Sequence, residues 1–64
     1  MLENHLYNLV EQLAHENKSL WRIKNNYQKD AGDCHDCAAF WKDLEQDKEK
    51  HVRDLMALIK KHSN

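Results

Sequence analysis

The stretch Lys29–Cys37, KDAGDCHDC, contains the only glycine of a 64-residue chain that has no proline. Gly32 suits the left-handed residue that follows a helix C-terminus, and Asp33 suits the N-cap of a second helix. Asp36 falls in the first turn of that second helix, where a negative charge meets the positive end of the helix dipole. The stretch therefore predicts a short turn, residues 31–33, between two helices.

Residues on both sides of this turn follow the alternating four- and three-residue spacing of the seam in a helical bundle. The first seam consists of Leu2, Leu6, Leu9, Leu13, Glu16, Leu20, Ile23 and Tyr27, and the second of Cys37, Trp41, Leu44, Lys48, His51, Leu55, Leu58 and His62. Helices are expected over about residues 2–30 and 34–62, and so short a turn makes them antiparallel neighbours. The predicted fold class is an all-α, antiparallel two-helix hairpin that forms a single domain over residues 1–64.

Further apolar residues widen both seams, so each helix is expected to face more than one neighbour. They are Tyr7, Val10, Ala14 and Trp21 in the first helix and Phe40, Val52 and Ile59 in the second. A chain this short buries little of its own surface, and small folds usually need a disulfide, a metal or a partner chain. Two hairpins are therefore expected to pair as a homodimer, which gives a four-helix bundle.

Composition and charge argue against two classes of binding partner. The net charge is −1 with acidic and basic residues interspersed, whereas a nucleic-acid binder usually carries a one-sided basic excess. The longest apolar run, residues 37–41, is far shorter than the roughly 20 residues that a membrane-spanning helix needs. The N-terminus also lacks the basic and apolar regions of a signal peptide. The sequence predicts a cytoplasmic protein that binds neither nucleic acid nor membrane.

Charged residues interrupt the two seams at matching levels. Aligning the seams across the turn places Glu16 beside Lys48, with His51 one turn further along and Asp47 at the edge. One interpretation is a buried or half-buried ion pair of Glu16 and Lys48 capped by His51, which fixes register and partner choice more than it adds stability. The other is a metal ion held by Glu16, Asp47 and His51, from one chain or from two.

The second helix carries a family resemblance. Its segment FWKDLEQDKEKHVRDLMALIKKH, residues 40–62, resembles the last helix of a ferritin-like, rubrerythrin-type half-bundle, and the helix with AHENKSLW, residues 14–21, is similar to its partner helix. The resemblance implies a bundle that holds two metal ions with lone glutamates and Glu-x-x-His pairs. It makes Glu16 and His51 candidate ligands, with iron, zinc or no cofactor left open. However, the residue three before His51 is Lys48, whose cation repels a metal, so the resemblance implies a salt bridge in the metal's place.

The motif Cys34-His35-Asp36-Cys37 opens the predicted second helix, where the helix dipole lowers the pKa of a thiol. Three interpretations stay open. Cys37 is a core residue opposite Tyr27 beside an incidental Cys34, or the pair is half of a zinc site that needs a second chain, or it is a redox dithiol.

The chain has no evident nucleophile with a neighbouring base and no glycine-rich phosphate loop. The predicted function is therefore a non-enzymatic, dimeric helical-bundle protein of ferritin-like ancestry, with a structural, interaction or regulatory role. Its expected partner is a second copy, and a different protein partner stays open. A metal-binding protein and a small thiol redox sensor are the alternatives.

Overall fold

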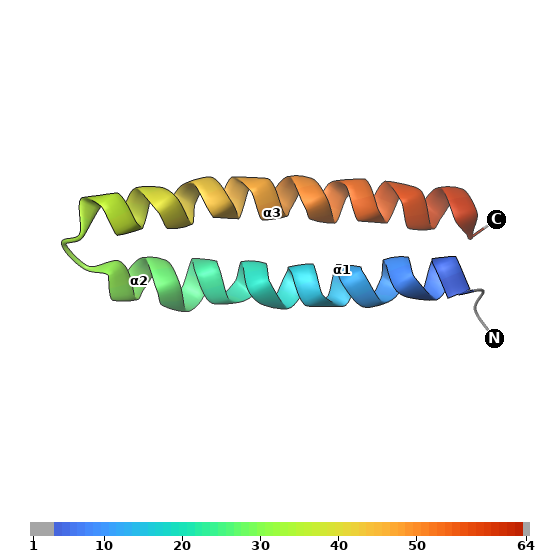
Figure 1. Cartoon of the computed structure of the whole chain (residues 1–64), viewed down its shortest axis with the longest axis horizontal. Helices are drawn as coiled ribbons and strands as arrows, with labels where there is room; N and C mark the ends of the chain where they lie inside the picture. Colours follow the sequence, from blue (N-terminus) through green and yellow to red (C-terminus); the bar gives the residue numbers. More distant parts are fainter. Residues whose placement is uncertain (1–3, 64) are drawn as a thin grey trace.

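The computed structural model describes residues 4–63, which form two long helical segments joined by a short turn (Figure 1). The elements are α1 (Asn4–Arg22), the π-helical η1 (Ile23–Tyr27), α2 (Gln28–Ala31) and α3 (His35–His62). The predicted all-α helical hairpin is confirmed. Leu2, where the first helix was expected to begin, lies outside the described residues.

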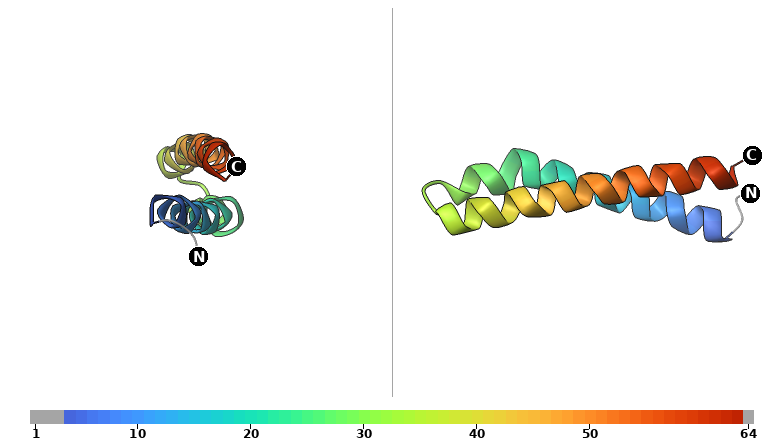
Figure 2. Two further views of the ribbon diagram at one scale, coloured as in Figure 1. Left: turned by 90° about the vertical axis from the view of Figure 1, so that its right-hand side faces the viewer. Right: turned by 90° about the horizontal axis from the view of Figure 1, so that it is seen from above.

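The two helical segments lie side by side in a single layer. The molecule measures 47 × 17 × 13 Å, and the first turn of α1 lies at the same end of it as the last turn of α3 (Figures 1 and 2). Its radius of gyration is 14.5 Å, whereas a compact domain of this length has about 11 Å. The described residues therefore contain no second layer that would cover the outer faces of the helices.

The chain reverses at Gly32, whose φ of 57° and ψ of −121° are rarely adopted by residues that carry a Cβ atom. The N-cap of α3 is Cys34, and the expectation of Asp33 at that position is wrong. The first helical hydrogen bond runs from the Ala38 N–H to the Cys34 carbonyl, at 2.9 Å. The Cys34 Sγ also accepts from the Cys37 N–H at 3.3 Å, as an N-cap side chain does. Asp33 therefore belongs to the turn.

A wide turn interrupts the first helical segment at η1, which the regular seam did not predict. The Gln28 N–H donates to the carbonyl of Ile23, five residues earlier, and the side-chain amide of Asn25 donates to the Trp21 carbonyl at 2.8 Å. A π-turn contains more residues than an α-turn, so it rotates the residues that follow it. The ring of Tyr27 consequently packs against Trp41, with 4.8 Å between the ring centroids.

The core between the helices is thin. Ile23, 1% exposed, is the only fully buried hydrophobic residue among those described, and the seam leucines from Leu6 to Leu55 are half-buried. Several residues that the seams place in the core are instead exposed: Tyr27, Cys37, His51, Leu58 and His62. The reason is geometric, because one neighbouring helix covers only one side of each apolar stripe. Exposed Cys37 also corrects its interpretation as a core residue opposite Tyr27.

Candidate functional site

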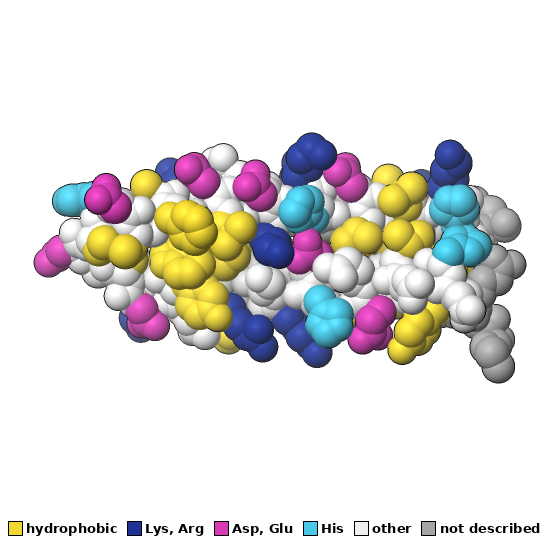
Figure 3. Space-filling view, viewed as in Figure 1, with side chains coloured by type: hydrophobic (Ala, Val, Ile, Leu, Met, Phe, Trp, Pro, Cys, Tyr) yellow, Lys and Arg dark blue, Asp and Glu magenta, His cyan; other side chains and the backbone are white. Residues whose placement is uncertain are grey.

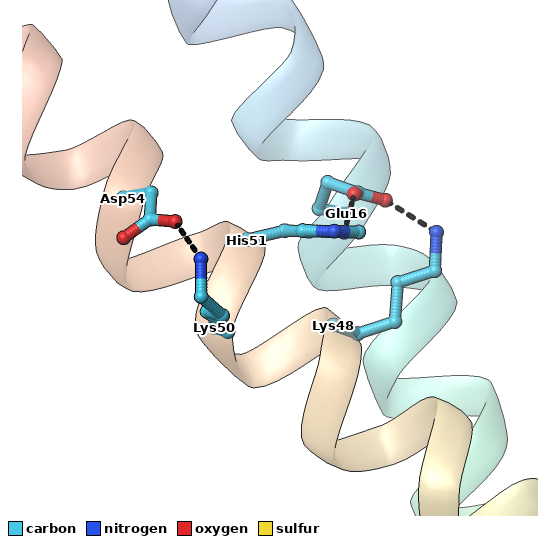
Figure 4. Close-up of polar contacts among 5 residues, drawn as sticks. All are labelled: Glu16, Lys48, Lys50, His51 and Asp54. Atoms are coloured by element: carbon cyan, nitrogen blue, oxygen red, sulfur yellow. Dashed lines mark hydrogen bonds and ion pairs between the residues drawn. The ribbon is translucent and has the colours of Figure 1, made fainter.

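Glu16 is the centre of the most developed polar site in the hairpin. It lies on α1 and is only 7% exposed, yet both of its carboxylate oxygens have partners on α3 (Figure 4). The Oε2 atom accepts a hydrogen bond from the Lys48 Nζ at 2.7 Å. The Oε1 atom lies 2.9 Å from the His51 Nδ1. We call these three residues the Glu16 cluster.

Helix geometry explains why α3 supplies both partners. Lys48 and His51 are three residues apart, so their side chains project from one face of the helix towards α1. Because an ionised carboxylate only accepts hydrogen bonds, the His51 Nδ1 carries a hydrogen and donates a hydrogen bond to the Glu16 Oε1. The side chain of Lys48 is 22% exposed and that of His51 is 51% exposed, so the cluster runs from the interface to the surface.

Electrostatics keeps the buried carboxyl group ionised. The hydrogen bond from Lys48 lowers the pKa of Glu16, burial raises it, and the hydrogen bond with His51 lowers it again, with a net shift below the usual value. A buried charge costs several kcal/mol unless it is paired, so each partner offsets part of that cost. Among the described residues, every buried side-chain nitrogen or oxygen has a hydrogen-bond partner.

Asp47 is exposed, and no contact brings it to the Glu16 cluster. Within residues 4–63, no group of three or more His, Cys, Asp and Glu side chains is arranged to hold a metal ion. The ligand set implied by the ferritin-like resemblance does not fit one hairpin, because the ammonium of Lys48 occupies one oxygen of Glu16. The single chain therefore presents an ion-pair cluster.

An open groove of about 320 Å³ runs beside the cluster. It is lined by Gln12, Glu16, His51, Asp54, Leu55 and Leu58. Two of these residues, Gln12 and Asp54, were missed by the sequence reasoning, although helical spacing was a usable signal: Gln12 is four residues before Glu16, and Asp54 is three after His51. Asp54 also accepts from Lys50 at 2.8 Å, which lowers the pKa of its carboxyl group.

Aromatic side chains cluster near the turn. The ring of Trp41 lies 4.8 Å from that of Tyr27 and 5.1 Å from that of Phe40, and Phe40 is 57% exposed. We call these three residues the aromatic cluster. Figure 3, in which the turn is on the left, shows hydrophobic side chains gathered on the half of the face nearer the turn, with charged and histidine side chains towards the middle. Such a patch is a common mark of a protein interface.

The two thiols lie at the start of α3. Both are free and exposed. Hydrogen bonding with the Cys37 side chain and backbone lowers the pKa of the Cys34 thiol, and the same interaction between the two side chains raises the pKa of Cys37. Cys34 is therefore the residue that ionises first, and Cys37 is its hydrogen-bond donor.

Two further findings bear on identity. No helix within residues 4–63 is both long and apolar enough to cross a membrane. Comparison with protein-family models, with curated proteins and with solved structures found no match to this chain. The ferritin-like resemblance accordingly stays a prediction, and the function of the chain is inferred from its own geometry.

Proposed function

We propose that this chain is a non-enzymatic assembly module that pairs with a second copy to form an antiparallel four-helix bundle. The observation that carries the proposal is the amount of large apolar side chain left exposed on one hairpin. The exposed residues are Tyr7, Val10, Trp21, Tyr27, Phe40, Met56 and Leu58. Burying such a side chain fully stabilises a protein by about 1.5–3 kcal/mol, so a second layer would be strongly favoured.

A second copy is the partner that the dimensions and charges favour. Another hairpin has the same 47 Å length and the same wide apolar stripes, so a two-fold axis would match them along their whole length. Each chain carries 10 basic and 11 acidic side chains, which leaves little net charge to repel a second copy. The open groove beside Leu55 and Leu58 gives the second layer an apolar surface on which to pack.

The Glu16 cluster has a definite role in this assembly. Its buried carboxylate accepts the Lys48 ammonium on one side and faces the half-exposed His51 on the other. An apolar partner surface that slid over His51 would strip water from a polar group without replacing its hydrogen bonds. The cluster therefore disfavours shifted pairings, which is the best-attested use of polar residues in bundle cores.

The proposed setting is the cytoplasm, because two free thiols persist in a reducing compartment. The role would be structural or regulatory, exercised through assembly. Ferritin-like ancestry, if the resemblance reflects descent, would explain why a half-bundle pairs with itself.

Sedimentation equilibrium of the full chain tests the proposal. The wild type is expected to sediment with twice the mass of one chain at micromolar concentration. Phe40→Glu, which puts a charge into the aromatic cluster, is expected to sediment as a monomer. Lys42→Glu introduces the same residue at an exposed position two residues away, and it should remain a dimer. A helical wild type that stays monomeric up to millimolar concentration would exclude self-assembly as the function.

A further inference from the structure

We propose that Cys34 and Cys37 form a site for thiol–disulfide exchange with small organic disulfides. Cys34 is the attacking thiolate and Cys37 is the thiol that resolves the mixed disulfide. The proposal does not depend on dimer formation, since both cysteines and the turn that precedes them belong to one chain.

Geometry brings the two sulfur-bearing residues onto one turn of backbone. Cys34 is the N-cap of α3 with an extended backbone, φ −78° and ψ 98°, and Cys37 lies three residues further on in the first turn. The Cys34 Sγ accepts from the N–H of Cys37 itself, at 3.3 Å. The sulfur of Cys34 is therefore held over the residue that carries the second thiol.

The surroundings of the two cysteines favour Cys34 as the attacking thiolate and Cys37 as the protonated thiol. Both side chains are exposed, so a dissolved disulfide can reach them. The hydrogen bonds that hold the Cys34 Sγ stabilise its thiolate, whereas Cys37 is the partner that keeps its proton. Because the thiolate is the reactive form, the first attack belongs to Cys34.

The reaction needs no oxidant other than the organic disulfide, and water carries the protons. The Cys34 thiolate attacks one sulfur of the organic disulfide, the S–S bond breaks, and one small thiolate leaves. Cys37 then loses its proton to water and attacks the Cys34 sulfur, which breaks the mixed disulfide and releases the second small thiolate. The protein dithiol loses two electrons and two protons, and the organic disulfide gains them to become two thiols.

Oxidised glutathione is the probe, incubated with the reduced full chain and followed by mass spectrometry after acid quenching. The wild type should lose two hydrogen atoms and carry no persistent glutathione. Cys37→Ser, which lacks the resolving thiol, should accumulate one glutathione on Cys34. Cys34→Ser is the matched control, in which the lone Cys37 should react more slowly, because it lacks the N-cap hydrogen bond that the Cys34 Sγ accepts.

Two results would overturn the assignment. One is equal rates of glutathione addition in the two single-cysteine variants, since the order of attack would then have no structural basis. The other is a wild type that ends with two glutathiones, since Cys37 would then fail to resolve the mixed disulfide. Circular dichroism establishes that both variants are folded.

Discussion

Glu16 is only 7% exposed, and burying a charged carboxylate lowers the stability of a folded protein unless the charge is paired. Glu16 is retained in that position by a permanent cation on one oxygen and an imidazole on the other. Removing Lys48 would leave His51 as the only remaining partner of the buried charge among the contacts described above. Removing Lys48 should therefore lower the stability of the fold more than removing His51, whose side chain is half-exposed.

We predict that Lys48→Met lowers the free energy of unfolding by about 1–3 kcal/mol, because Glu16 then keeps its charge without its cationic partner. Urea unfolding followed by circular dichroism, at one fixed protein concentration, measures the change. Lys50→Met is the matched control, since Lys50 also pairs with a carboxylate, Asp54, but both side chains are more than half exposed. It should cost no more than about 0.5 kcal/mol. Equal losses in the two variants would contradict a special role for the cluster.

The lowered pKa of Glu16 predicts how stability depends on pH. The unfolded chain takes up a proton near the ordinary glutamate value of 4.5, while the folded chain resists protonation until a lower pH. The ionised pair thus adds stability that is fully present above pH 4.5 and is lost as the pH falls through the lower, folded-state pKa.

The test compares wild type with Glu16→Gln between pH 7 and pH 2.5, since the other carboxyl groups titrate in both proteins and cancel. The stability advantage of the wild type should be fully present above about pH 4.5 and should shrink below it. A difference that stays constant over the whole range would show that the Glu16 charge adds nothing to stability.

For single residues, the sequence predicted which side chains of the two helices lie together better than it predicted which side chains are exposed to solvent. Alignment of the seams places Glu16 beside Lys48, and their charged atoms lie 2.7 Å apart in the structure. The alignment works because seam spacing alone determines which residues of two adjacent helices share a level. It could not predict that His51 and Cys37 are exposed, since exposure depends on whether a second layer covers the seam.

Among the elements, the turn and η1 differ in how readily they could be predicted. A lone glycine between two periodic segments is a strong turn signal, and Gly32 has the expected positive φ. The π-turn of η1 leaves no such signal, because Ile23 and Tyr27 keep the spacing of an unbroken seam. Tyr27, the last residue of η1, contacts Trp41, which the seam alignment does not pair with it.

The turn itself supports a prediction about Gly32→Ala. An added Cβ would meet nothing closer than the Asp30 carbonyl oxygen at 4.0 Å, so the cost comes from the backbone conformation alone. A φ of 57° is unfavourable for alanine, and we expect a loss of about 1–2 kcal/mol in the free energy of unfolding.

Asp33→Ala is the control in the same turn, and chemical denaturation measures both variants. Asp33 has a negative φ and is not the N-cap of α3, so its replacement should change stability by less than about 0.5 kcal/mol. A larger loss at Asp33 than at Gly32 would show that the cap assignment to Cys34 is wrong.

The hairpin as a whole has a very small hydrophobic core for its length. A single layer with one fully buried hydrophobic residue, Ile23, lacks the core that usually stabilises a small domain without disulfides or metal. The second copy proposed above would supply the contacts that this layer lacks. The wide apolar stripes of the sequence already favour such a partner.

If folding and pairing are coupled, thermal stability must depend on protein concentration. A hundredfold dilution changes the free energy of a dimer-linked unfolding by about 2.7 kcal/mol at 25 °C. With about 2.1 cal/mol/K of unfolding entropy per residue over two chains, the midpoint should fall by roughly 10 °C. Circular dichroism melts at 1 and 100 µM measure this shift.

Phe40→Glu should melt at a lower temperature that is the same at both concentrations, because it has no partner to lose. A wild-type midpoint that does not move on dilution would mean that one hairpin folds by itself, and the exposed aromatic cluster would then require another explanation.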